Sequence, residues 1–129
     1  MVHKKGNKIM SEVEQQQESA SILEQELRIF QEDLHKTAVD KGWWDEPRDD
    51  AISIALMHSE LSEALEALRH GNPPDDKVPE FSGVEAELAD TIIRILDMAE
   101  AKNYNVIGAM IAKAKMNKSR SHKHGGKTF

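Results

Sequence analysis

Apolar residues recur at intervals of three and four along four stretches of the chain, a spacing typical of helices that bury one face. The pattern predicts helices over residues 19–41, 49–69, 84–102 and 105–120. The alternation expected of strands is scarce, and alanine, leucine, isoleucine and glutamate dominate the middle of the chain. The predicted fold class is therefore all-α. The apolar stripe of the first helix consists of Ile22, Leu23, Leu27, Phe30, Leu34 and Ala38.

Helix-starting and helix-stopping residues set the limits of these segments. Gly42 ends the first helix, and Asp49 or Asp50 caps the second. Gly71 and the two prolines after Asn72 stop the second helix, so residues 70–83 form a loop. Asn105 caps the fourth helix. The chain is therefore expected to have a mobile polar tail (1–18), one all-α domain (19–120) and a basic, glycine-containing tail (121–129).

Composition narrows the functional classes. A chain of 129 residues accommodates one domain, and its formal net charge of −6 argues against a general affinity for nucleic acid. The absence of cysteine excludes disulfides, thiolate metal sites and cysteine nucleophiles. No apolar run approaches membrane-spanning length, and the basic N-terminus lacks the apolar stretch of a secretory signal. We therefore expect a cytoplasmic enzyme or binding module with no membrane partner.

Two acidic pairs with i, i+3 spacing carry the candidate chemistry. Glu60 and Glu63 share one face of the second helix, and Glu87 and Asp90 share one face of the third. Acidic pairs are common in so acidic a chain, and a solvated helix face is the plainer interpretation of any one pair. Both pairs, however, lie at the edge of a predicted buried face, beside small residues, whereas Glu66 points to solvent. The adjoining leucine-rich arc, expected in the core, is Ile54, Met57, Leu61, Leu65 and Leu68.

If the second and third helices pack antiparallel across the proline loop, the four carboxylates converge and repel one another. A divalent cation would remove that repulsion, and oxygen-only ligands suit Mg²⁺, with Mn²⁺ as a substitute, rather than zinc. Mg²⁺ also keeps coordination positions for phosphate oxygens, which indicates a phosphorylated substrate. A di-iron site would need Glu-x-x-His pairs, which these positions lack.

The acidic motif and several other segments resemble those of one family. ExxE at residues 60–63, a spacer of 23 residues and ExxD at residues 87–90 resemble the signature of the MazG-like, all-α nucleoside triphosphate pyrophosphohydrolases. Compact, single-domain members are also similar in KGWWD (41–45), HGNPP (70–74), EFSGVEAELAD (80–90), KxxxNxxR (113–120) and HGGK (124–127). The resemblance covers about residues 20–129.

The resemblance implies a four-helix-type bundle that assembles as a dimer or a dimer of dimers, with substrate pockets built across a subunit interface. It also implies Mg²⁺-dependent cleavage of a nucleoside triphosphate between the α- and β-phosphates, giving a nucleoside monophosphate and pyrophosphate. Deoxynucleotides, dGTP among them, are the substrates it favours. A phosphoribosyl-ATP pyrophosphohydrolase, which shares the chemistry, and a non-catalytic helical interaction module are the alternatives.

The resemblance also implies roles for individual residues. Glu60, Glu63, Glu87 and Asp90 hold the metal, and Glu63, ahead of Glu60, is the expected catalytic base. Lys113, Asn117 and Arg120 share a helix face that suits triphosphate oxygens, although an ordinary basic helix end would look the same. Lys127 is a further phosphate-binding candidate. One of Trp43 and Trp44 would stack on the base, unless it is buried at a subunit interface.

Three neighbouring residues are expected to have supporting roles. His35 lies near the apolar stripe and is expected to be a structural histidine whose hydrogen bonds are satisfied. Arg94, four residues after Asp90, is expected to pair with it. Asp97 shares the flank of Asp90 and is expected to support the metal ligands from behind.

Overall fold

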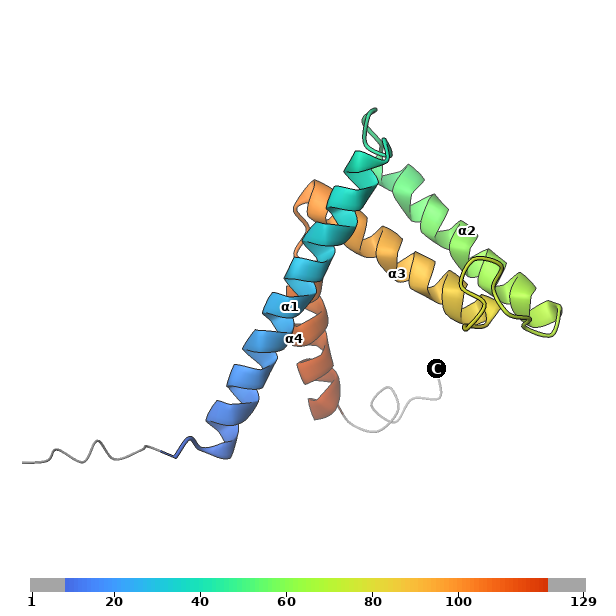
Figure 1. Cartoon of the computed structure of the whole chain (residues 1–129). Coiled ribbons are helices and arrows are strands. Elements are labelled where there is room, and N and C mark those ends of the chain that lie inside the picture. The colour runs from blue at the N-terminus through green and yellow to red at the C-terminus, as the bar shows by residue number, and fades with distance from the viewer. Residues whose placement is uncertain (1–8, 121–129) are drawn as a thin grey trace, which may run out of the picture.

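The structure, a computed structural model, describes residues 9–120, and within that range it contains helices and no β-strand (Figure 1). The helices are α1 (Glu12–Asp40), α2 (Asp50–Arg69), α3 (Gly83–Lys102) and α4 (Val106–Ser119). Asp49 caps α2 and Asn105 caps α4, each accepting a hydrogen bond from a backbone N–H of the first turn. The predicted all-α class is confirmed. None of the helices in this range is long and apolar enough to cross a membrane.

The first helix begins earlier than predicted. The Ser11 side chain accepts a hydrogen bond from the Glu14 N–H at 3.2 Å, and the Glu14 carboxylate accepts one from the Ser11 N–H at 3.1 Å. This reciprocal capping box starts α1 at Glu12, so residues 12–18 are helical and not part of a tail. The signal is a plain Ser-x-x-Glu, but the segment lacks the apolar periodicity on which the prediction relied.

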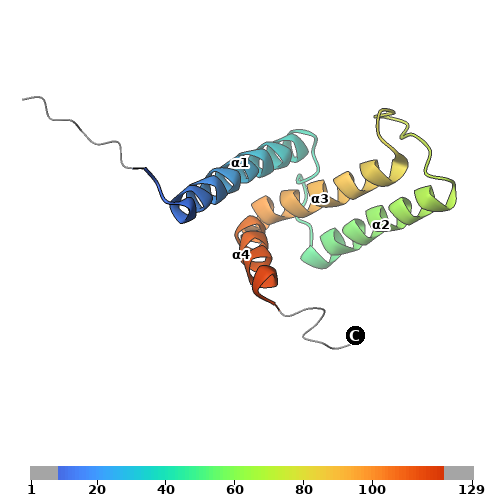
Figure 2. The same ribbon diagram turned by 90° about the horizontal axis from the view of Figure 1, so that it is seen from below.

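Helices α2 and α3 form an antiparallel hairpin joined by a well-bonded loop (Figures 1 and 2). Asn72, at a positive φ of 51°, accepts a hydrogen bond from the Val84 N–H through its side chain at 2.9 Å. The Gly83 N–H donates to the Pro73 carbonyl at 2.8 Å. A Cβ at Gly83 would lie 3.0 Å from Cβ of Ala67, so the glycine permits the close approach of the two helices at the loop. The loop thereby fixes the register of the acidic pairs.

Helix α3 is the central element, with α2 along one side and the second half of α1 along another, and α4 lies against α1 (Figures 1 and 2). Polar contacts tie these layers together. Gln31 of α1 donates to Glu100 of α3 at 2.9 Å, and Arg28 of α1 donates to Asn105 at 2.8 Å. The N-terminal half of α1 extends away from α2 and α3 (Figure 1).

The predicted core face of α2 is wrong. Within the described residues, the buried apolar side chains are Ala64, Leu96, Met98, Ala99 and Ile107. Helix α2 packs on α3 through the side that carries Ser53 and Ala64, both buried. Small residues let the helix axes approach closely, and they bring the acidic flank with them. The leucine-rich arc is left largely uncovered, and its members Ile54, Leu61, Leu65 and Leu68 are 43–54% exposed.

The stripe of α1 is likewise buried only in part. Leu27, Leu34 and Ala38 are half-buried towards α3, whereas Ile22, Leu23 and Phe30 are more than half exposed. With the neighbouring Ile29, the exposed residues form what we call the α1 apolar face, consisting of Ile22, Leu23, Ile29 and Phe30. The exposed members of the α2 arc, consisting of Ile54, Leu61, Leu65 and Leu68, are called the α2 leucine face.

Candidate metal centre

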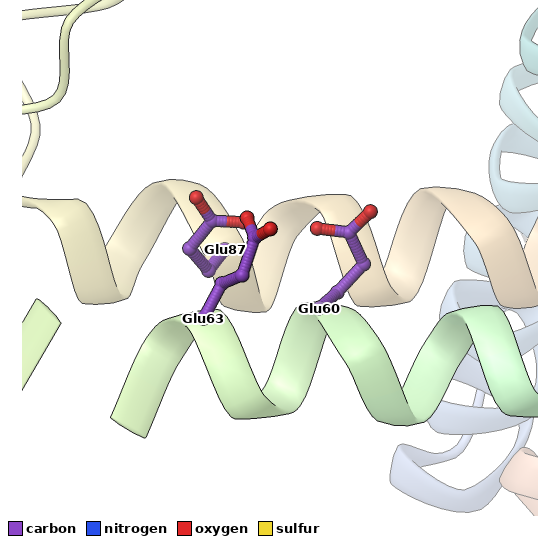
Figure 3. Close-up of side chains that lie close together, drawn as sticks. All are labelled: Glu60, Glu63 and Glu87. Atoms are coloured by element: carbon purple, nitrogen blue, oxygen red, sulfur yellow. The ribbon is translucent and has the colours of Figure 1, made fainter. Parts of the chain in front are cut away.

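Three carboxylates converge between α2 and α3. Glu60 and Glu63 come from successive turns of α2 and Glu87 from the first half of α3, and one oxygen of each lies within 4.8 Å of the others (Figure 3). In Figure 3 the carboxyl groups of Glu63 and Glu87 point towards each other across the hairpin, and Glu60 stands one turn away on α2. The predicted i, i+3 geometry on α2 therefore places both acids towards α3.

Glu87 is the most perturbed member of this acidic cluster. Burial raises the pKa of its carboxyl to about 7, assisted by a hydrogen bond to Glu60 and by the charges of Glu63, Glu60 and Asp90. Its Oε2 is buried and has no hydrogen-bond partner within the described residues. A carboxylate oxygen that is removed from water and left unpaired costs free energy, and either a proton or a cation would relieve the strain.

Asp90 lies in the same cavity but outside the group of three. Loss of hydration at its carboxyl raises the pKa of Asp90, and the charge of Glu60 acts in the same direction. Arg94 and Lys77 oppose the shift, so the Asp90 carboxyl feels both the acids and the cations of the cavity. Asp90 is therefore close enough to Glu60 to feel its charge, which is compatible with the predicted ligand set. In that set Asp90 would be the outermost ligand.

These acids face a cavity of about 660 Å³ between α1, α2, α3 and the loop before α3. Acidic residues outnumber basic residues in its wall. The acids are Glu60, Glu63, Asp75, Asp76, Glu87, Asp90 and Asp97, and the bases are Lys41, Arg48, Lys77 and Arg94. A negatively charged ligand would be repelled from this wall unless cations entered with it. The volume lies in the range of small-molecule sites.

The cavity fits a hard divalent cation. Its donors are carboxylate oxygens from two rigid helices, with no sulfur or imidazole in the cluster of three. The unpaired Glu87 oxygen and the raised pKa of Glu87 both indicate a site that is short of positive charge. Glu60, Glu63 and Glu87 would hold the cation, and Asp90 could complete the set from the rim.

Arg94 pairs with a different acid from the one predicted. Its Nε donates to Oε1 of Glu60 at 2.7 Å, across the hairpin, and not to Asp90 on its own helix. The guanidinium also lies 5.7 Å from the ring centroid of Trp43. Sequence spacing indicated the intrahelical pair, but the close packing of α2 on α3 brings Glu60 nearer.

The two tryptophans have different environments, although both line the cavity. The Nε1–H of Trp44 donates to both carboxylate oxygens of Asp97 at 3.0 and 3.1 Å, and Arg48 lies over its ring. The ring of His35 meets Trp44 edge-on, and its Nδ1 lies 2.7 Å from Oδ1 of Asp97. Asp97 thus anchors Trp44 and His35, and its support of the metal ligands stays a prediction. Trp43 is 53% exposed, with the Arg94 guanidinium over its ring.

The α4 residues predicted to bind phosphate lie elsewhere. Lys113, Asn117 and Arg120 are exposed, and none of them lines the cavity. Helix α4 follows the C-terminal end of α3 (Figure 1), whereas Glu87 lies near the N-terminal end of α3. One chain therefore does not bring them to the acids. Lys127 lies outside the described residues.

Sequence reasoning missed several wall residues. Asp75, Asp76 and Lys77 belong to the predicted loop, but only the folded loop places them at the cavity. Asp75 accepts hydrogen bonds from the backbone N–H groups of Val78 and Lys77, which lower the pKa of its carboxyl. Ser53 is buried in the wall, and its Oγ has no hydrogen-bond partner in the part of the chain that the structure describes. Its only sequence signal was its position among the small residues of α2.

Comparison of the chain with protein-family models, with curated protein sequences and with solved structures finds no match.

Proposed function

We propose that the protein is a Mg²⁺-dependent nucleoside triphosphate pyrophosphohydrolase, which cleaves the α–β phosphoanhydride to a nucleoside monophosphate and pyrophosphate. The observation that carries the proposal is the convergence of Glu60, Glu63 and Glu87 in a cavity-lining cluster with one buried, unpaired oxygen. It is the activity implied by the resemblance to the MazG-like family. An exposed tryptophan in the same cavity offers a stacking surface for a base.

The acids have separable tasks in this proposal. A bound Mg²⁺ supplies positive charge for the phosphates and lowers the pKa of water. Glu60 is already held by Arg94, whereas Glu63 has no hydrogen-bond partner within residues 9–120. Glu63 offers one oxygen to the cation, and its second oxygen can accept the proton of the water that attacks the α-phosphorus. Glu87 and Asp90 lie opposite it on α3 and complete the negative wall that holds the cation.

We also propose that the working protein is a dimer or a dimer of dimers, in which four-helix-type packing is completed between copies. The α1 apolar face and the α2 leucine face are contiguous sets of large apolar side chains, and soluble monomers rarely leave such patches open. A stable dimer buries about 800 Å² per partner. A second copy would also bring a second α4, whose Lys113, Asn117 and Arg120 could then reach the phosphates.

A substrate panel tests the activity. The common ribo- and deoxynucleoside triphosphates, dGTP among them, and phosphoribosyl-ATP are each incubated with the protein and Mg²⁺ or Mn²⁺, and phosphorus NMR resolves the products. Pyrophosphate and a monophosphate as first products support the proposal, whereas orthophosphate contradicts α–β cleavage. Turnover of phosphoribosyl-ATP alone would assign the protein to that related activity.

Two further measurements separate an enzyme from a helical interaction module. An interaction module predicts no Mg²⁺ binding and no thermal shift with nucleotide plus metal, whereas the proposed enzyme gains stability from both together. Sedimentation velocity reports the assembly, for which a dimer or tetramer is expected. A monomer at micromolar concentration would contradict the proposed association.

A further inference from the structure

Among the four predicted metal ligands, only Glu60 has a basic partner within the described residues. The Nε of Arg94 lies 2.7 Å from Oε1 of Glu60, and the two side chains are only 26% and 14% exposed. Ion pairs shielded in this way are screened less by salt than surface pairs. Glu63, Glu87 and Asp90 have no ion-pair partner in residues 9–120. Within residues 9–120, Arg94 is thus the one positive charge paired with the acidic cluster.

Arg94 also has a second contact in the same cavity. Its guanidinium carbon lies 5.7 Å from the ring centroid of Trp43, an exposed residue of the same cavity wall. A guanidinium keeps its charge at any ordinary pH and can stack on an aromatic face while its N–H groups turn to a new acceptor. The side chain can therefore leave Glu60 without leaving the cavity.

A divalent cation bound by Glu60, Glu63 and Glu87 would stand next to the guanidinium that now occupies Glu60. Two like charges at one carboxylate repel each other strongly where water is partly excluded. This repulsion favours the release of Arg94 from Glu60, and the released guanidinium then needs an anion. The cavity wall is otherwise rich in acids, so the nearest favourable acceptor is a phosphate group carried in with the cation.

We propose that Arg94 is an exchangeable counter-ion, which neutralises Glu60 before the metal binds and moves to the phosphates of the ligand afterwards. This inference rests on the proposed function and adds to it a dependence of metal binding on the anion that accompanies the metal. Arg94 weakens the binding of a bare cation and strengthens the binding of an anion that arrives with one. Metal and phosphate binding become positively coupled through one side chain.

The competing explanation is that Arg94 only clamps α2 to α3. Under that explanation, removing the guanidinium loosens the hairpin and weakens every ligand. Exchange predicts effects of opposite sign on the bare cation and on the anion. Arg94→Gln tests the charge, and Arg94→Lys keeps the charge on a side chain without the planar fork. Arg69→Gln is the matched control, because Arg69 pairs with Glu66 on the exposed side of α2, outside the cavity.

The experiment measures two dissociation constants by calorimetry on the full chain. The first is for Mn²⁺ alone, and the second is for inorganic pyrophosphate at saturating Mg²⁺. In Arg94→Gln we expect Mn²⁺ to bind about 3- to 10-fold more tightly and pyrophosphate about tenfold more weakly, as the loss of one partly shielded charge interaction predicts. Arg94→Lys should fall between this variant and the unmodified protein, and Arg69→Gln should match the unmodified protein in both constants.

A spectroscopic measurement follows Arg94 itself. The Nε–H resonance of Arg94, identified by its absence from Arg94→Gln, should shift when Mg²⁺ is added to the unmodified protein and shift again with pyrophosphate. An unmodified protein that binds Mn²⁺ while Arg94→Gln binds it equally or more weakly overturns the exchange and leaves the proposed enzyme standing. An unmodified protein that binds no Mn²⁺ overturns both.

Discussion

The α2–α3 hairpin packs through small and acidic residues, whereas the α1 apolar face and the α2 leucine face leave large apolar residues exposed. In the hairpin, Ser53 and Ala64 are buried beside Glu60, and the acidic cluster lies along the contact between the two helices. On the α2 leucine face and the α1 apolar face, side chains that could form a core remain about half exposed.

This difference separates two kinds of incompleteness. The hairpin lacks positive charge, since Glu87 keeps a buried, unpaired oxygen and an elevated pKa. The two apolar faces lack a partner surface. We expect a small cation to complete the first and a second copy of the chain to complete the second. Each of the following predictions perturbs one region and uses the other, or a matched residue, as its reference.

The largest effect is expected from Glu63→Gln. Loss of the proposed proton acceptor should lower kcat/KM for the best triphosphate of the substrate panel by about 100-fold or more. The fold should persist, because Glu63 is exposed and makes no internal hydrogen bond within the described residues. Glu66→Gln, three residues further along α2 but outside the cavity, should retain activity within about twofold. Equal losses in the two variants would separate the activity from the hairpin cluster.

The second prediction concerns pH and Glu87. Below pH 4.5 the carboxyl is protonated in both the folded and the unfolded chain, and its contribution to stability is fully present. Between pH 4.5 and about 7 only the folded chain keeps the proton, so the free energy of unfolding of the metal-free protein should fall as pH rises through this window. Thermal melts from pH 4 to 8 measure the change.

The same proton competes with the metal. Apparent Mg²⁺ affinity should rise by up to about tenfold per pH unit below pH 7 and level off above it, because metal binding displaces one proton from Glu87. Glu87→Gln should flatten both pH profiles and should bind Mg²⁺ more weakly at pH 8. A metal affinity independent of pH in the unmodified protein would contradict the role assigned to Glu87.

A third prediction addresses the apolar faces. Phe30→Ser should raise the dissociation constant of the oligomer about tenfold or more, since a half-exposed aromatic ring of the α1 apolar face would lose its burial against the second copy. Sedimentation velocity across a concentration series measures it. Gln25→Ser, at an exposed polar position of α1, should leave the constant unchanged. If both variants sediment like the unmodified protein, this face is not the interface.

The smallest expected effect distinguishes the tryptophans. Trp44→Phe removes the donor to Asp97 and should lower the free energy of unfolding by about 1–3 kcal/mol, because the partly buried carboxylate loses a partner. Trp43→Phe should leave stability within about 0.5 kcal/mol and instead weaken nucleotide binding, if its exposed ring stacks on the base. Urea titrations and nucleotide titrations of both variants provide the comparison, and a reversed pattern would exchange the two roles.

Local signals in the sequence carried much of the architecture. Asp49 and Asn105 cap helices where predicted, and the prolines after Asn72 and the glycine before it end α2 at Arg69. The i, i+3 spacing placed Glu60 and Glu63 on one side of α2, beside small residues, and the structure keeps them there. These features depend on backbone sterics and on neighbours within one turn, which a sequence states directly.

Choices between neighbouring faces were decided only by tertiary packing. The helical periodicity of α2 identifies a leucine face and a small-residue flank, but not which of them meets α3, because that depends on the shape of α3 and on how closely Gly83 and Ala67 allow the helices to approach. The close packing of α2 on α3 pairs Arg94 with Glu60 instead of Asp90, and tertiary packing also brings Trp44 to Asp97.

The sequence by itself thus determined four helices, the N-caps of α2 and α4 and two acidic pairs at the edge of a face. Only the tertiary structure decided that the half-buried Glu87 lies against Glu60 and Glu63, that Arg94 pairs with Glu60, and that the leucines of α2 stay exposed. The physical reason is the distance along the chain between the residues that interact. Helix formation and capping are settled within a few residues, whereas burial, ion pairing and pKa depend on side chains that only packing brings together.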